Sequence, residues 1–121
     1  MTISYSRTGN DSVDGIDISK ALDYIRDNAA ELAAAKAARI YLEQFRKSKK
    51  ALLINNAESG TIQAKESYAY AHDEYLELLE NLRTAVEQEE NFKWMMVAAQ
   101  LKVEVYRTQQ ANNRFIDKAH T

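Results

Sequence analysis

One stripe of side chains recurs alternately three and four residues apart along the second half of the chain. The stripe is apolar apart from one glutamate, and it consists of Tyr75, Leu78, Leu82, Ala85, Glu89, Phe92, Met96, Ala99, Val103 and Tyr106. This spacing keeps side chains on one face of an α-helix and is close to the heptad spacing by which helices pack side by side. It predicts a long helix over residues 73–115, and we call the stripe the heptad seam.

The first half of the chain predicts a second long helix, which runs without a breaker to Leu53. Asp17 or Ser19 can accept a hydrogen bond from a first-turn amide and so begin this helix. The alanine-rich stretch at residues 29–38 favours helix and allows a neighbouring helix to approach closely. The expected apolar face consists of Leu22, Ile25, Ala29, Leu32, Leu42, Phe45 and Leu52.

Turn-forming residues separate the two long helices at one place. Asn55 and Asn56 tolerate the left-handed conformation that ends helices, and Ser59 with Gly60 suits a turn. Proline is absent from the chain, and the other glycines are Gly9 and Gly15. The chain is therefore expected to reverse direction between residues 55 and 60.

These elements predict an all-α fold, a long antiparallel helical hairpin that is coiled-coil-like. We expect a short intervening helix over residues 61–71 and a restart at His72 or Asp73. The hairpin domain covers residues 17–121, and residues 1–16, which are poor in large aliphatic side chains, form a flexible N-terminal tail. Each long helix begins acidic and ends basic, so antiparallel pairing brings opposite charges together at both ends.

Apolar residues outside the heptad seam exceed what a two-helix hairpin can bury. They include Leu76, Leu79, Val86, Met95 and Leu101. Much of the 45% hydrophobic content is alanine, which buries little area per residue. We therefore expect a homo-oligomer, or the docking of another partner on this surface.

Charge and composition narrow the class of protein. The 121 residues carry a formal net charge of −2 and no cysteine. This balance gives no global attraction to nucleic acid or anionic membranes and no disulfide framework. The sequence starts without an apolar signal region and contains no run long enough to span a membrane. We expect a cytoplasmic protein that binds no membrane.

A run of basic residues near the end of the first long helix is one candidate binding site. Its members are Arg46, Lys47, Lys49 and Lys50. With the nearby rings of Tyr41, Phe45, Tyr68 and Tyr70 it could neutralise phosphates and stack on unpaired bases. The alternative, which the net negative charge favours, is a solvated helix end that pairs with acids of the opposite helix.

Two ionisable residues stand out by their positions. Glu89 falls on the heptad seam, where a carboxylate is costly unless it is paired, so we expect it to meet Lys36 or Arg39 and to fix the register. His72 lies beside Asp73 and is interpreted as a capping or surface histidine rather than as an acid, base or metal ligand.

Three further residues are candidate contacts with a partner. Trp94 cannot face the same way as Phe92 and Met96, because neighbours on a helix splay about 100° apart. It is predicted to point to a second interface, which is either a core or dimer contact or a site for a different partner. Arg107 and Arg114 lie one heptad apart on one face and could clamp phosphates or acidic side chains, with a solvated helix terminus as the alternative.

Catalytic motifs are lacking in the sequence. It has no glycine-rich phosphate loop, nucleophile elbow, paired histidines or metal-ligand spacing. We therefore expect no enzyme activity, no cofactor and no metal.

The chain contains three helical segments, IYLEQFRKSKKALL, YAHDEYLELLENL and WMMVAAQLKVEVYRTQQANNR. These segments resemble a group of short phage and prophage helical proteins found among replication and recombination genes. The resemblance covers residues 20–114 and implies a phage accessory protein of the bacterial host cell, with no site residues carried over. We hypothesise a non-catalytic interaction protein, accessory to DNA replication or recombination or an antagonist of a host defence complex. It would bind stoichiometrically to itself and to another protein. The alternatives are a direct single-stranded nucleic-acid-binding protein and a virion structural component.

Overall fold

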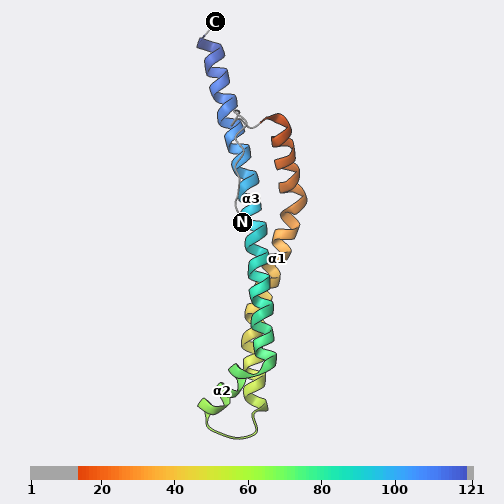
Figure 1. The fold of residues 1–121 in the computed structure, drawn as a ribbon, viewed down its shortest axis with the longest axis vertical. Coiled ribbons are helices and arrows are strands. Elements are labelled where there is room, and N and C mark those ends of the chain that lie inside the picture. The colour runs from red at the N-terminus through yellow and green to blue at the C-terminus, as the bar shows by residue number, and fades with distance from the viewer. Residues whose placement is uncertain (1–13, 120–121) are drawn as a thin grey trace, which may run out of the picture. The chain divides into compact units, whose positions relative to one another are not determined.

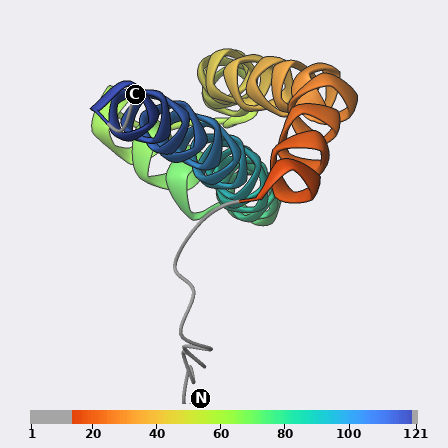
Figure 2. The same ribbon diagram turned by 90° about the horizontal axis from the view of Figure 1, so that it is seen from above.

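The computed structural model describes residues 14–119, which form three helices (Figures 1 and 2). They are α1 (Gly15–Asn56), α2 (Ile62–Ala71) and α3 (Asp73–Ala119), and no strand occurs in this range. The predicted all-α class and the short intervening helix are confirmed. The expected tail at residues 1–16 falls mostly on residues 1–13, which lie outside the described residues.

The start of α1 differs from the prediction. The helix begins at Gly15, because the side chain of Asp14 caps it: Oδ1 of Asp14 accepts a hydrogen bond of 2.8 Å from the backbone N–H of Asp17. The expectation that Asp17 or Ser19 caps the helix is therefore wrong. Asp17 instead supplies a negative charge in the first turn, where the helix dipole favours it.

The corner between α1 and α2 depends on Gly60. The helix α1 ends at Asn56, three residues beyond the predicted Leu53, and neither asparagine is left-handed; within residues 14–119 only Gly60 has a positive φ, 125°. A Cβ placed there would lie 3.3 Å from Cβ of Ala64, so a side chain would be both strained and crowded. Thr61 then caps α2, its Oγ1 accepting a hydrogen bond of 3.1 Å from the N–H of Ala64.

His72 separates α2 from α3. Its backbone is extended (φ −68°, ψ 138°), and its N–H donates to the carbonyl of Ala69 at the end of α2. Its Nδ1 accepts a hydrogen bond of 3.1 Å from the N–H of Glu74 in the first turn of α3. The helical conformation is thus interrupted at this one residue, and the capping role predicted for His72 is confirmed.

The chain divides into two compact units. We call residues Ala30–Trp94 the corner unit and the stretches Met1–Ala29 and Met95–Thr121 the terminal unit. In the corner unit the end of α1 and the start of α3 run antiparallel beside each other, held by a core of Leu53, Ala69 and Tyr75 (Figure 1). In the terminal unit the buried side chains within residues 14–29 and 95–119 are Ala21, Met96 and Ala99.

Burial along α3 confirms the predicted heptad seam. Each of its ten members is buried or half-buried, whereas Leu76, Val86, Met95 and Leu101, outside the seam, are exposed. The half-buried Glu89 takes its predicted place among the apolar members. The spacing of apolar residues was therefore sufficient to orient α3.

The inward face of α1 differs from the predicted one. Leu22, Ala29, Phe45 and Leu52 are exposed. Buried or half-buried residues recur instead four and three positions apart, at Ala21, Ile25, Asn28, Leu32, Ala35, Arg39, Leu42, Arg46, Lys49 and Leu53. Polar members interrupt this stripe, so hydrophobicity alone does not reveal it.

Within residues 14–119 no helix combines the length and the apolar character needed to cross a bilayer.

Candidate partner-binding surfaces

The buried core of the described residues is small. Its members are Ala21, Ala35, Leu53, Ala69, Tyr75, Leu78, Ala85, Met96 and Ala99, and more than half of them are alanine. Large apolar side chains are exposed on all three helices, among them Tyr41, Ile62, Trp94, Leu101 and Phe115. The surfaces around these side chains are therefore candidates for binding a partner.

An ion pair joins the two long helices inside the corner unit. Arg39 on α1 donates through Nε and Nη2 to the two carboxylate oxygens of Glu89 on α3, and the Nη2 bond measures 3.2 Å. Nη1 of Arg39 also donates to both oxygens of Glu43, at 3.0 and 3.1 Å. The hydrogen bonding from Arg39 to Glu89 is the chief cause that lowers the pKa of the Glu89 carboxyl. Of the two partners predicted for Glu89, the structure selects Arg39.

The basic run does not form one exposed patch. Nζ of Lys49 lies 2.8 Å from the carboxylate of Glu74 on α3, and this hydrogen bond lowers the pKa of Glu74. Nζ of Lys50 lies 4.5 Å from the ring centroid of Tyr70, within cation–π range. Arg46 is half-buried and Lys47 is exposed. Two of the four cations are thus engaged within the fold, and one of them, Lys49, pairs with an acid of the opposite helix as the alternative expected.

The aromatic residues near the basic run contact other rings of the same unit. Tyr41 stacks parallel to Phe45 at a centroid distance of 6.0 Å. Tyr68 meets His72 edge-on at 5.5 Å, and Tyr70 meets Tyr75 edge-on at 5.4 Å. Their faces are therefore partly covered by one another.

Trp94 faces away from the heptad seam, as the helical spacing predicted, and its exposure excludes the core contact that was one alternative for it. It is 63% exposed, while Met96 is 8% exposed. Its Nε1 donates a hydrogen bond of 3.0 Å to the carboxylate of Glu90 one turn earlier. The polar end of the indole is satisfied, and its apolar area remains available for an interface.

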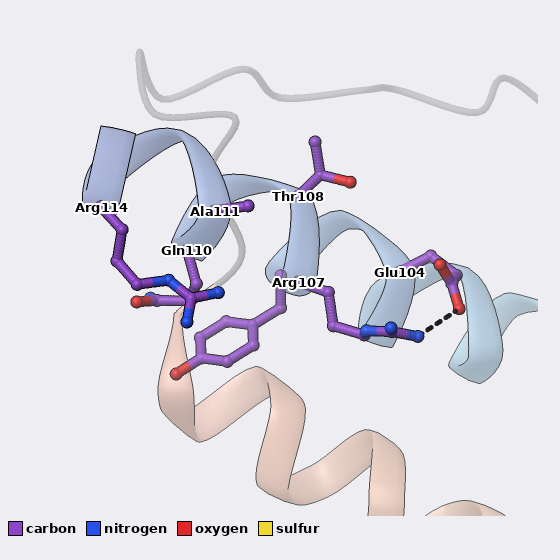
Figure 3. A pocket seen from close by; sticks show the side chains of 7 residues that line it. Glu104, Arg107, Thr108, Gln110, Ala111 and Arg114 are labelled. Atoms are coloured by element: carbon purple, nitrogen blue, oxygen red, sulfur yellow. Dashed lines mark hydrogen bonds and ion pairs between the residues drawn. The ribbon is translucent and has the colours of Figure 1, made fainter. Parts of the chain in front are cut away.

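Arg107 and Arg114 line one open depression on the C-terminal part of α3 (Figure 3). The depression has a volume of about 390 Å³, and Thr108, Gln110 and Ala111 also line it. An ion pair of 3.4 Å joins Arg107 to Glu104, with both side chains about two-thirds exposed or more. The predicted shared face of the two arginines is therefore present.

Sequence reasoning missed a groove in the terminal unit. It lies between the start of α1 and α3, has a volume of about 230 Å³ and is lined by Ala21, Tyr24, Met95, Ala98 and Ala99. Lys20 and Lys102 line it as well. One signal in the sequence could have indicated this groove. Ala21 follows Lys20 on the first helix, and Ala98 and Ala99 lie one turn before Lys102 on the last helix.

Within residues 14–119, no group of three or more side chains is placed to hold a metal ion. Comparisons with protein-family models, with curated proteins and with solved structures find no match to this chain.

Proposed function

We propose that this chain is a non-catalytic helical interaction protein that acts by stoichiometric binding to an acidic surface of another protein. The observation that carries the proposal is the C-terminal part of α3. Residues 107–119 are helical, yet every side chain among them except Gln109 is exposed. This last part of α3 continues the long helix with its side chains in solvent, where they are accessible to a partner.

Two kinds of side chain on this segment indicate the chemistry of its partner. Phe115 and Ile116 are 75% and 51% exposed, and they supply apolar area. Arg107 and Arg114 supply planar guanidinium groups that bind carboxylates with two parallel hydrogen bonds. Arg114 and Phe115 line one depression of about 510 Å³, so an acidic surface with an apolar area beside it matches these two side chains. Ile116, two residues after Arg114, faces away from the arginines.

The wider role of the protein is proposed from the sequence. The resemblance of its helical segments to phage and prophage proteins supports an accessory role in DNA replication or recombination, or antagonism of a host defence complex. The regular spacing of buried residues on α1 and α3 supports a coiled-coil-like hairpin. Direct binding of single-stranded nucleic acid is less favoured, because Lys49 and Lys50 are engaged within the fold.

The proposal is tested by replacing both arginines with glutamine. The full-length tagged chain is expressed in a bacterial host, and the stoichiometry of the recovered complex is measured by native mass spectrometry. Arg107→Gln combined with Arg114→Gln should remove the partner while circular dichroism stays unchanged. The matched control is Arg83→Gln, which alters an exposed arginine of α3 that also pairs with a glutamate on its own helix.

Three results would contradict the proposal. The double variant could retain the partner at the same ratio. A labelled single-stranded oligonucleotide could bind the purified chain with steep salt dependence, which would favour the nucleic-acid alternative. Finding the chain in purified phage particles at a fixed copy number would favour a virion component.

A further inference from the structure

We infer that the groove of the terminal unit is a self-association site, and that Trp94 of a second copy of this chain occupies it. The proposal joins two features that lie in different units: an exposed indole in the corner unit and a largely apolar groove in the terminal unit. The contact is made between copies, so it requires no particular arrangement of the two units within one chain. It is independent of the partner proposed for Arg107 and Arg114.

The groove has the size and chemistry of a site for one aromatic side chain. Its volume of about 230 Å³ lies below the roughly 300–1,000 Å³ of small-molecule sites. Its walls are alanine, methionine and the ring of Tyr24. Methionine thioethers and tyrosine rings make favourable contacts with indole.

Charge complementarity identifies the occupant as this chain's own tryptophan. Lys20 and Lys102 line the groove, and the structure records no ion pair for either within the part of the chain that it describes. Trp94 carries a carboxylate with it, because its Nε1 binds Glu90, and the exposed Glu87 lies one further turn away. An indole seated in the groove would bring these acids toward the two lysines.

The surroundings of Glu90 leave it able to make such a contact. The side chain of Glu90 is 49% exposed, and besides the indole it has one ion-pair partner among the described residues: Nζ of Lys93 lies 4.0 Å from its Oε1. A carboxylate that is oriented by the indole and only weakly paired to lysine can accept a further ammonium donor. Trp94 and Glu90 therefore form one composite knob, apolar at its centre and acidic at its edge.

The first experiment uses the chain's single tryptophan as a reporter. Analytical ultracentrifugation of the full chain should show mass rising with concentration, and the tryptophan emission should shift to shorter wavelength over the same range. Trp94→Ala should raise the dissociation constant about tenfold or more, as expected for a hot-spot residue. Ile62→Ala, which truncates another exposed apolar side chain, should leave association unchanged.

The second experiment tests the charge contact by exchange. Glu90→Lys alone and Lys102→Glu alone should each weaken self-association, because each places like charges at the knob and the groove. A mixture of the two variants should associate again, since each knob then meets a groove of opposite charge. Circular dichroism of each variant checks that the helices remain folded.

The outcomes decide the proposal. A wild-type chain that stays monomeric at all concentrations would overturn it, as would self-association that survives Trp94→Ala or a mixture that fails to recover. None of these results affects the arginine-dependent complex, which is measured on different variants. Failure of the self-association site and failure of the proposed function are thus separable.

Discussion

The corner unit and the terminal unit hold their helices together in different ways. In the corner unit, ion pairs of Arg39 with Glu89 and of Lys49 with Glu74 cross from α1 to α3 beside a core that includes Leu53 and Tyr75. In the terminal unit, Arg26 pairs with Asp23 and Asp27 on α1, and Arg107 pairs with Glu104 on α3. The corner unit therefore has cross-helix polar contacts that specify alignment, whereas the terminal unit has a groove and exposed surface suited to binding.

The largest effect is expected from the core of the corner unit. Leu53 is 3% exposed, so Leu53→Ala should lower the free energy of unfolding by about 2–5 kcal/mol through lost burial and a residual cavity. Urea unfolding followed by circular dichroism measures this loss. The matched control is the neighbouring Leu52→Ala, at a side chain that is 54% exposed, which should change stability by no more than about 0.5 kcal/mol. Equal effects at the two leucines would contradict the assigned face of α1.

An intermediate effect compares two seam alanines. Ala85 is 8% exposed in the corner unit, and Ala85→Leu should cost about 1–3 kcal/mol by overpacking. Ala99 of the terminal unit lines the groove, so the larger side chain of Ala99→Leu has space to enter and should cost less. Urea unfolding of both variants measures the difference. A larger loss at Ala99 would show that the groove cannot accept a side chain.

The smallest effect is a pH dependence of the ion pair between the helices. Arg39 lowers the pKa of Glu89, so the pair stabilises the fold fully above the pKa of the unfolded carboxyl, about 4.3. That contribution is lost as pH falls through the lowered pKa of the folded state. Glu89→Gln should therefore reduce Tm at neutral pH by less than Leu53→Ala does, and its difference from wild type should shrink in acid.

Arg26→Gln is the control for the pH experiment. Its side chain is 72% exposed and pairs only with acids of its own helix among the described residues, so Tm should stay close to that of wild type across the same pH range. If the difference in Tm between Glu89→Gln and wild type stays constant down to the lowest pH, the charge of Glu89 does not stabilise the fold.

The sequence predicted α3 better than α1 for a physical reason. On α3 the inward face is apolar except at Glu89, so hydrophobic spacing alone identifies it. On α1 the inward stripe includes Arg39 and Lys49, whose side chains are 24% and 23% exposed because acids on α3 pair with them. Those partners are distant in sequence, and a pattern along one helix cannot show them.

The candidate sites were predictable to different degrees. Helical spacing alone turned Trp94 away from the face of Phe92 and Met96 and placed Arg107 with Arg114 on one face, and both placements are confirmed. The engagement of Lys49 and Lys50 depends on Glu74 and Tyr70, which contact them only after the chain has reversed. The groove was missed for the same reason, because its walls come from both ends of the chain.

Alanine supplies five of the nine buried side chains of the described residues, and this has a consequence for how the two long helices separate. Alanine has no side-chain rotamers to lose on folding, so burying it immobilises no side-chain torsion. It also buries little area, so each turn adds only a small increment of free energy. Away from the core that includes Leu53 and Tyr75, each buried alanine therefore adds little free energy, and the helix ends farthest from that core should separate first.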